Sequence, residues 1–263
     1  PPVRQRRVRL ARAGLIAALL LCSAALVVRS DAAYTGTVAP SGSSFASVSQ
    51  DYGCALGGTV VNQVQSGTTT IGGGGSPSGP VTLTATATIS SVDTTKSFVT
   101  FSVSSPGNGI NPGAINVRAE LTNSTTVTFT RATSEAAPVQ MNLAWTVVEY
   151  ACGVTVQRGT VVVAATTTNV TISAVSSTGR TFVLWSKTPN QADTAWRGDD
   201  TAIVELTSTT NLQITTSSAP TNHVLAWQVV EFTNPGAATV QRGNSAAFND
   251  TSTLSTSPKK APP

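Results

Sequence analysis

The residues best suited to bind a ligand are concentrated in one segment, PNQADTAWRGDD, at positions 189–200. They are an aromatic ring, a guanidinium group and three carboxylates: Trp196, Arg197, Asp193, Asp199 and Asp200. Sugar sites combine stacking on an aromatic ring with directional hydrogen bonds to charged groups. The segment therefore predicts a glycan-binding loop. Two alternatives stay open: calcium held by the three aspartates, although the EF-hand spacing is absent, and a surface loop whose tryptophan packs on its own domain.

Residues with catalytic potential are few. His223 is the only histidine, and a Ser-His-Asp mechanism would need it as the general base. No nucleophile-elbow motif accompanies it, so the sequence favours a histidine that is capped or packed on a strand. One histidine and two cysteines in the body of the chain do not make an ordinary zinc site, and the glycine run at 72–79 lacks the Gly-Lys-Ser/Thr of a phosphate loop. We therefore expect a protein that is not an enzyme and that uses no metal and no cofactor.

A pair of related segments supplies the scaffold for the loop. LAWTVVEYACGVTVQRG occupies Leu143–Gly159, and LAWQVVEFTNPGAATVQRG occupies Leu225–Gly243. In both, the positions of Leu, Trp and Val alternate as expected when successive side chains of a strand point to opposite faces. The two copies differ in length by two residues, an even number that preserves the facing of every later side chain. We predict that each segment is a β-hairpin that closes a module.

The similarity extends over the whole of both modules. Matching positions recur 82 to 85 residues apart: Ile89/Ile172, Phe98/Phe182, Glu120/Glu205, Trp145/Trp227 and Val156/Val240. Self-similarity at a fixed period indicates repeated structural units. The sequence therefore predicts an all-β fold, with two tandem antiparallel β-sandwich modules that are related by internal duplication and span residues 60–155 and 156–248.

Each module contains about six predicted strands, which are short, rich in Thr and Val, and separated by clusters of Gly, Pro, Asn and Ser. In the second module they are Val156–Val163, Asn169–Val175, Thr181–Lys187, Thr201–Leu206, Asn211–Ser217 and Leu225–Phe232. Neither module contains a segment with a helical period. Because VQRG at 156–159 ends one module and begins the next, the modules either share a strand or abut closely.

Charged residues also recur at four matching positions: Lys96/Arg180, Glu120/Glu205, Glu149/Glu231 and Arg158/Arg242. One interpretation is a polar binding site that is made twice. The interpretation that we favour is internal charge pairing at the strand ends, because charges close to a hydrophobic core must be paired.

The basic residues are concentrated at the start of the chain. Six of the 16 Lys and Arg lie in the first 30 positions, and ten basic and eleven acidic residues follow position 32. This balance argues against nucleic acid as a partner. An arginine-rich start, an apolar run at Ala13–Val28 and small residues up to Ala32 predict a signal peptide helix at 1–32. We therefore expect a secreted or cell-surface protein that contacts the membrane only if this segment stays uncleaved. A twin-arginine signal and a lipoprotein signal at Cys22 are further alternatives.

Two cysteines, Cys54 and Cys152, remain after the predicted cleavage. An even pair in an oxidising compartment predicts a disulfide; the alternative is two unpaired small residues in the core. Residues 33–59 are rich in Ser, Gly and Ala and predict an irregular linker or arm. The polar residues 249–263 predict a disordered tail.

The pattern W-x-V-V-E-[Y/F] followed by V-Q-R-G, with T-x-[K/R]-x-F-V upstream, resembles uncharacterised repeat proteins of bacterial secretomes over most of residues 60–245. The chain is also loosely similar to H-type lectins, six-stranded sandwiches that bind sugars and often trimerise. We expect an exported structural or adhesive protein of the cell surface or extracellular matrix. Its modules would self-associate through unprotected strand edges or bind cell-surface components. The alternative is a lectin-like protein that binds glycans through the Trp196 loop.

Overall fold

The computed structural model describes residues 54, 57–72, 83–104, 111–132, 140–189 and 195–242. These residues all belong to one compact unit, residues 50–263. The predicted signal peptide and tail, and nearly all of the predicted arm, lie outside the described residues. Within the described ranges, no helix has the length and hydropathy of a membrane span.

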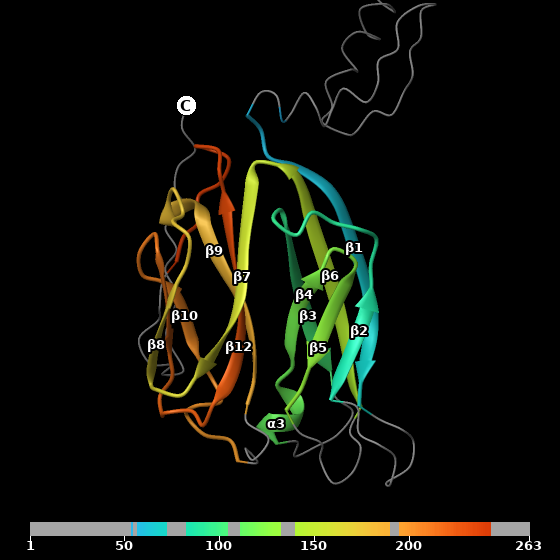
Figure 1. Cartoon of the computed structure of the whole chain (residues 1–263), viewed down its shortest axis with the longest axis vertical. Helices are drawn as coiled ribbons and strands as arrows, with labels where there is room; N and C mark the ends of the chain where they lie inside the picture. The colour runs from blue at the N-terminus through green and yellow to red at the C-terminus, as the bar shows by residue number, and fades with distance from the viewer. Residues whose placement is uncertain are drawn as a thin grey trace, which may run out of the picture. The chain divides into compact units, whose positions relative to one another are not determined.

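The fold is all-β, and the strands of each sheet run antiparallel (Figure 1). We call strands β1–β6 the first sandwich: β1 (Val60–Ile71), β2 (Thr84–Thr88), β3 (Ser97–Ser104), β4 (Arg118–Asn123), β5 (Thr126–Thr130) and β6 (Met141–Cys152). We call strands β7–β12 the second sandwich: β7 (Val154–Val163), β8 (Thr167–Thr171), β9 (Thr181–Thr188), β10 (Ile203–Leu206), β11 (Asn211–Thr215) and β12 (His223–Phe232). A short helix, α3 (Pro112–Ile115), and a 3₁₀ turn, η2 (Thr178–Arg180), complete the described elements.

The two sandwiches have the same strand order. The first consists of sheets β1-β6-β3 and β2-β5-β4, and the second consists of sheets β7-β12-β9 and β8-β11-β10. In each sandwich the sixth strand is therefore central in one sheet and the fifth strand is central in the other. The third and fourth strands, β3 and β4 or β9 and β10, are edge strands.

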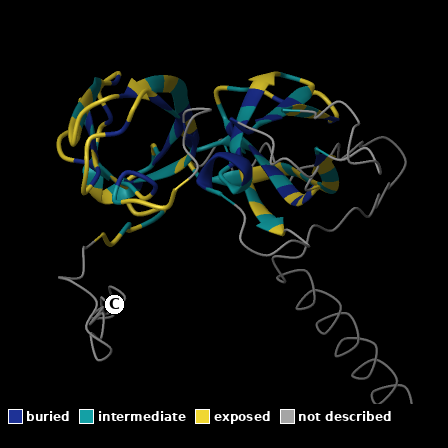
Figure 2. Cartoon of the chain, turned by 90° about the horizontal axis from the view of Figure 1, so that it is seen from below, coloured by how far each residue is buried: buried dark blue, intermediate teal, exposed yellow. Residues whose placement is uncertain are grey.

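Each sandwich has its own core, formed by the inward-facing side chains of both sheets. Leu143 and Trp145 of β6 pack with Phe129 of β5 in the first core, and Trp227 of β12 packs with Ile214 of β11 in the second. Along the strands, buried residues accordingly alternate with half-buried or exposed ones (Figure 2). Burial of each large apolar side chain contributes about 1.5–3 kcal/mol, so the alternation of the strands stabilises the fold.

The six strands predicted for the second module are present, and their ends differ from the prediction by at most four residues. The largest difference is at β8, which ends at Thr171 rather than Val175. Beyond Thr171 the chain leaves the ladder, and the N–H groups of Ile172 and Val175 donate to Thr210 O and Thr209 O. The sequence also failed to indicate helix α3, which begins where Asn111 accepts a hydrogen bond from the N–H of Ala114 (2.9 Å), an ordinary N-cap.

The hairpin predicted at Leu143–Gly159 is wrong. Strand β6 pairs with β1 and β3, whereas β7 pairs with β12 of the other sandwich. The two strands meet at Gly153 (Figure 1), whose φ is +77°, and the chain passes there from one sandwich to the next. The modules therefore abut and share no strand. The matching prediction at Leu225–Gly243 is also wrong, because 240–242 is not a strand.

The tryptophans explain this pairing. Gly67 lies opposite Trp145 in the β1–β6 ladder, and Gly159 lies opposite Trp227 in the β7–β12 ladder. A Cβ atom would lie 2.5 Å from the ring of Trp145 at Gly67 and 2.7 Å from the ring of Trp227 at Gly159. Each VQxG strand therefore packs against a tryptophan that lies most of a repeat later in the sequence. Gly159 faces Trp227 and not Trp145, the tryptophan that precedes it.

The glutamine of the VQxG element joins the two sheets of a sandwich. The side-chain amide of Gln65 donates to Ser90 O (3.0 Å) and accepts from Ser90 N (2.7 Å). Gln157 makes the same two bonds to Ser173, both 2.8 Å long. The repeated motif therefore has a structural explanation in both copies.

A disulfide joins Cys54 to Cys152, which lie 98 positions apart in sequence and whose Cα atoms are 5.7 Å apart. Cys54 lies before β1, and Cys152 is the last residue of β6. The bond therefore closes a loop that contains the whole first sandwich.

Candidate functional sites: the Trp196 loop and the sandwich junction

The predicted ligand residues lie between β9 and β10, in a loop described from residue 195 onward. Trp196 is 58% exposed, and Arg197 is exposed as well. Asp199 and Asp200 are buried. Asp193 lies outside the described residues. The loop therefore presents an aromatic ring and a guanidinium to solvent, whereas two of the three predicted carboxylates are enclosed by the protein.

The buried aspartates hold the loop in place. Asp200 Oδ2 accepts the N–H of Arg197 (2.6 Å), and Asp199 Oδ1 accepts the hydroxyl of Ser218 (3.4 Å). The N–H of Ser217 donates to Gly198 O (3.0 Å). These bonds join the loop to the segment that follows β11, so the two carboxylates fix the backbone beneath Trp196.

A buried lysine and histidine complete this cluster. Lys187 Nζ donates to the backbone oxygen of Asp199 and lies 3.2 Å from His223 Nδ1. His223 Nε2 lies 3.7 Å from Asp199 Oδ2. Because an ammonium group only donates, Nδ1 must accept, which places the proton of a neutral imidazole on Nε2, facing the carboxylate. The three side chains thus satisfy one another inside the sandwich.

The positions of these side chains show whether His223 could act as a general base. A general base needs a ring nitrogen that faces a nucleophile, whereas Nδ1 of His223 faces an ammonium and Nε2 faces a carboxylate. The hydroxyl of Ser218 bonds to Asp199, not to the imidazole. His223 is therefore placed to support the Trp196 loop, in agreement with the packed strand histidine that the sequence favoured.

Sequence reasoning missed Lys187 as a member of the cluster, although the repeat contains a signal for it. The matching positions in the first sandwich are Val103 for Lys187 and Met141 for His223, as the strand registers establish. A polar pair at positions that are apolar in the other copy indicates a local specialisation. Among the described residues, this buried polar support for a loop is therefore a feature of the second sandwich.

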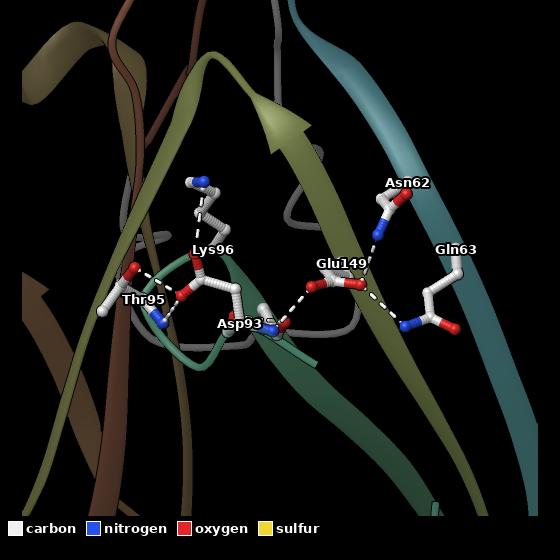
Figure 3. A network of polar contacts seen from close by, with 7 residues as sticks. Asn62, Gln63, Asp93, Thr95, Lys96 and Glu149 are labelled. Atoms are coloured by element: carbon white, nitrogen blue, oxygen red, sulfur yellow. Dashed lines mark hydrogen bonds and ion pairs between the residues drawn. The ribbon is translucent and has the colours of Figure 1, made fainter. Parts of the chain in front are cut away.

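The recurring glutamate of the sixth strand is an internal hydrogen-bond acceptor. Glu149 Oε2 accepts from Asn62 and Gln63, both at 2.7 Å, and Oε1 accepts the N–H of Asp93 at 2.6 Å (Figure 3). Its counterpart Glu231 accepts the N–H of Ser176 at 2.6 Å. The carboxylates tie the central strand to the loop between the two sheets, so this pair is not arranged as a binding site made twice.

The other recurring charges have mixed partners. Arg158, Arg180 and Arg242 each donate to backbone oxygens: Ser97 O, Phe232 O and Leu206 O, respectively. Ion pairs join Lys96 to Asp93 (3.2 Å) and Glu120 to Arg118 (2.7 Å). The predicted internal role is therefore supported, but charge pairing is only part of it, because most partners are neutral.

The second sandwich covers two strand edges of the first. The side-chain amide of Gln228, on β12, accepts from Val99 N (2.9 Å) and donates to Val99 O (2.8 Å) on the edge strand β3. Ser186 Oγ, on β9, accepts the N–H of Ala119 (3.0 Å) on the edge strand β4. Side chains of one sheet thus replace the neighbouring strand that each edge lacks.

An apolar cluster and a buried arginine complete this junction. Rings from both sandwiches lie in contact: Phe98 and Tyr150 of the first, and Phe182 and Phe232 of the second. They pack around Val154, Val156 and Val230. Arg158 donates to Ser97 O (2.6 Å) and to Thr94 O, and burial lowers its pKa to about 10.

No known protein-family model, curated protein or solved structure matches this chain. Function must therefore be argued from the loop and the junction themselves. In the described ranges, no group of three or more His, Cys, Asp or Glu side chains could hold a metal ion.

Proposed function

We propose that the chain is an exported structural or adhesive protein of the cell surface or extracellular matrix, and that it is not an enzyme. The observation that carries this proposal is the junction, where Gln228, Ser186 and a four-ring cluster fix one sandwich to the strand edges of the other. Such a junction holds two modules in one orientation, as a structural element requires.

The use of the polar residues supports the same proposal. The charged and amide side chains that recur in both copies bind backbone groups or one another within the fold, as Glu149 and Gln65 do. Catalytic sites instead keep such groups directed at a substrate. The small number of residues with catalytic potential in the sequence also supports the proposal.

We further infer that the two sandwiches descend from one duplicated unit. Three features support this inference: the identical strand order, the repeated Gly–Trp contact and the repeated Gln–Ser bonds. The boundary between the modules is then best placed at Gly153, two residues before the predicted end of the first module.

The test is to locate the protein and remove it. Antibodies against the folded region should detect the protein on intact source cells or in their matrix. Cells that lack the gene should lose cohesion or surface attachment, and the wild-type gene should restore it. Protein confined to the cytoplasm, or unchanged attachment without it, would contradict the proposal.

A second candidate function, glycan binding, is favoured by one specific observation. Trp196 is 58% exposed, and its loop is held by buried polar contacts among Lys187, Asp199 and His223. An exposed aromatic ring on a loop that is held by hydrogen bonds is suited to stacking on a sugar. On a glycan array, binding that is lost in Trp196→Ala but kept in Trp185→Ala, the control at a second exposed tryptophan, would support this function. An array without any bound glycan would exclude it for the sugars tested.

A further inference from the structure

The junction inside the chain is asymmetric. The second sandwich contributes a sheet face, the outward side of β7-β12-β9, whereas the first contributes two strand edges, β3 and β4. An interface in which the partners use different surfaces can repeat from one unit to the next without closing. The first sandwich has its own copy of the face, and the second has its own copy of the edges.

The unused face is the outward side of β1-β6-β3. Two of its residues match junction residues of the second sandwich in register, Val64/Val156 and Val148/Val230, whereas Phe98 of the same face already packs on Phe182 within the chain. Val64 is 59% exposed, whereas Val156 is 7% exposed. Ala144 of β6 is exposed, whereas its counterpart Ala226 is buried. The first sandwich thus exposes the small apolar surface that the second sandwich buries.

The unused edges are β9 and β10. A hollow of about 720 Å³ lies along them. It is lined by Val183 and Val204, the counterparts of the edge residues Val99 and Ala119. Ile203, which also lines the hollow, is 49% exposed. Edge strands with exposed apolar side chains favour association with another chain.

We propose that these two surfaces bind each other between copies: the β1-β6-β3 face of one copy docks on the β9 and β10 edges of another. The proposal rests on the structural role proposed above and names its partner, a second copy of this chain. The contact is head-to-tail, so it adds copies one after another into chains or rings and does not close a symmetric pair.

The registers indicate which bonds the new junction would repeat. Ser102 matches Ser186 and can accept the N–H of Val204 as Ser186 accepts that of Ala119. Thr146 matches Gln228, and its short hydroxyl side chain cannot make both bonds that the amide makes. The contact between copies is therefore weaker than the junction within a copy.

The end of the described chain competes for the same edge. The N–H of Val240 donates to Gly179 O (2.8 Å), as the N–H of Val156 donates to Thr95 O (2.7 Å) in the internal junction. Val240–Arg242 therefore occupies the place that β1 of an incoming copy would take. A chain shortened to end at Thr239 should associate more strongly than the full mature chain.

Sedimentation velocity on a concentration series tests the proposal, with Val64→Arg disabling the face and Ile203→Asp, next to Glu205, disabling the edges. Each variant alone should stay monomeric, with association weakened about tenfold or more because an unpaired charge would be buried. An equal mixture should form dimers that grow no further, since the intact face of one variant meets the intact edge of the other. Val162→Arg, at a valine 55% exposed outside both surfaces, should assemble like the wild type, and circular dichroism checks that every variant is folded.

Three results would overturn the docking: a wild-type chain and a Thr239-terminated chain that both stay monomeric up to about 1 mM, assembly that survives both substitutions, or a mixture that forms no dimer. A monomeric chain that is still found outside the cell and needed for cohesion would refute the docking alone. The proposed structural role would then stand.

Discussion

The side-chain amide of Gln228 occupies the place of a neighbouring strand for Val99, accepting from its N–H and donating to its C=O. Gln228→Ala removes both bonds and leaves an edge of β3 uncovered in a water-poor interface. We expect a loss of about 1–3 kcal/mol in unfolding free energy. Differential scanning calorimetry should show the single transition separating into two as the sandwiches uncouple. Gln213→Ala, which removes a half-buried glutamine whose hydrogen bond to Asn169 is exposed to solvent, is the control and should change little.

The indole of Trp145 differs from that of Trp227 in having a hydrogen-bond partner, since its Nε1 donates to Thr69 Oγ1 (3.1 Å). The matching residue in the second sandwich is Val161. Thr69→Val should therefore cost about 1–2 kcal/mol, because the half-buried N–H loses its acceptor. Urea unfolding measures the change, with Thr70→Val on the exposed side of β1 as the control. Equal effects of the two substitutions would contradict the assignment.

Gly153 combines a positive φ with a crowded site. A Cβ atom there would lie 2.6 Å from Gly58 O and 2.7 Å from Thr59 Cα. Gly153→Ala should therefore cost more than the roughly 1 kcal/mol of backbone strain alone. Gly236→Ala is a matched control, because its φ is +88° and nothing lies within 4 Å of the added Cβ. Thermal unfolding should show the larger loss at Gly153; similar losses would mean that strain, not crowding, decides.

Lowering the pH should reduce the stability of the first sandwich, because Asp93 loses its negative charge. Hydrogen bonds from Thr95, followed by the ion pair with Lys96, lower the pKa of Asp93 from its ordinary value of 3.8. A carboxyl group whose pKa is lower in the folded state stabilises that state above its unfolded pKa, and the contribution disappears as the pH falls through the folded pKa. Asp93→Asn should therefore lower the free energy of unfolding near pH 7. Below about pH 4, the free energy of unfolding of the variant should fall less steeply with pH than that of the wild type. An unchanged acid limb in chemical unfolding would contradict this.

The alternation of apolar residues and the 82–85-residue spacing were enough to predict an all-β chain and all six strands of its second half. They could not predict which strands pair. The hairpin interpretation failed because alternation fixes which face a side chain takes but not its partner, and the partner of Trp145 is a glycine 78 residues earlier, Gly67.

The candidate loop was predicted in part. The exposed position of Trp196 agrees with a ligand-binding role, which stays a prediction. The inward position of Asp199 and Asp200 could not be predicted, because it depends on Lys187 and His223, which are distant in sequence. The junction was also missed, because nothing local to β12 indicated that the amide of Gln228 reaches Val99.

The disulfide has a mechanical consequence. Tension that enters the chain ahead of Cys54 is transmitted through the sulfur bridge to Cys152, and from there across Gly153 into β7. The segment between the two cysteines is bypassed, so pulling on the N-terminal side cannot separate β1 from β6 while the bridge is intact. Under load, only the second sandwich and its attachment to the first would yield, and a reducing environment would make the first sandwich extensible.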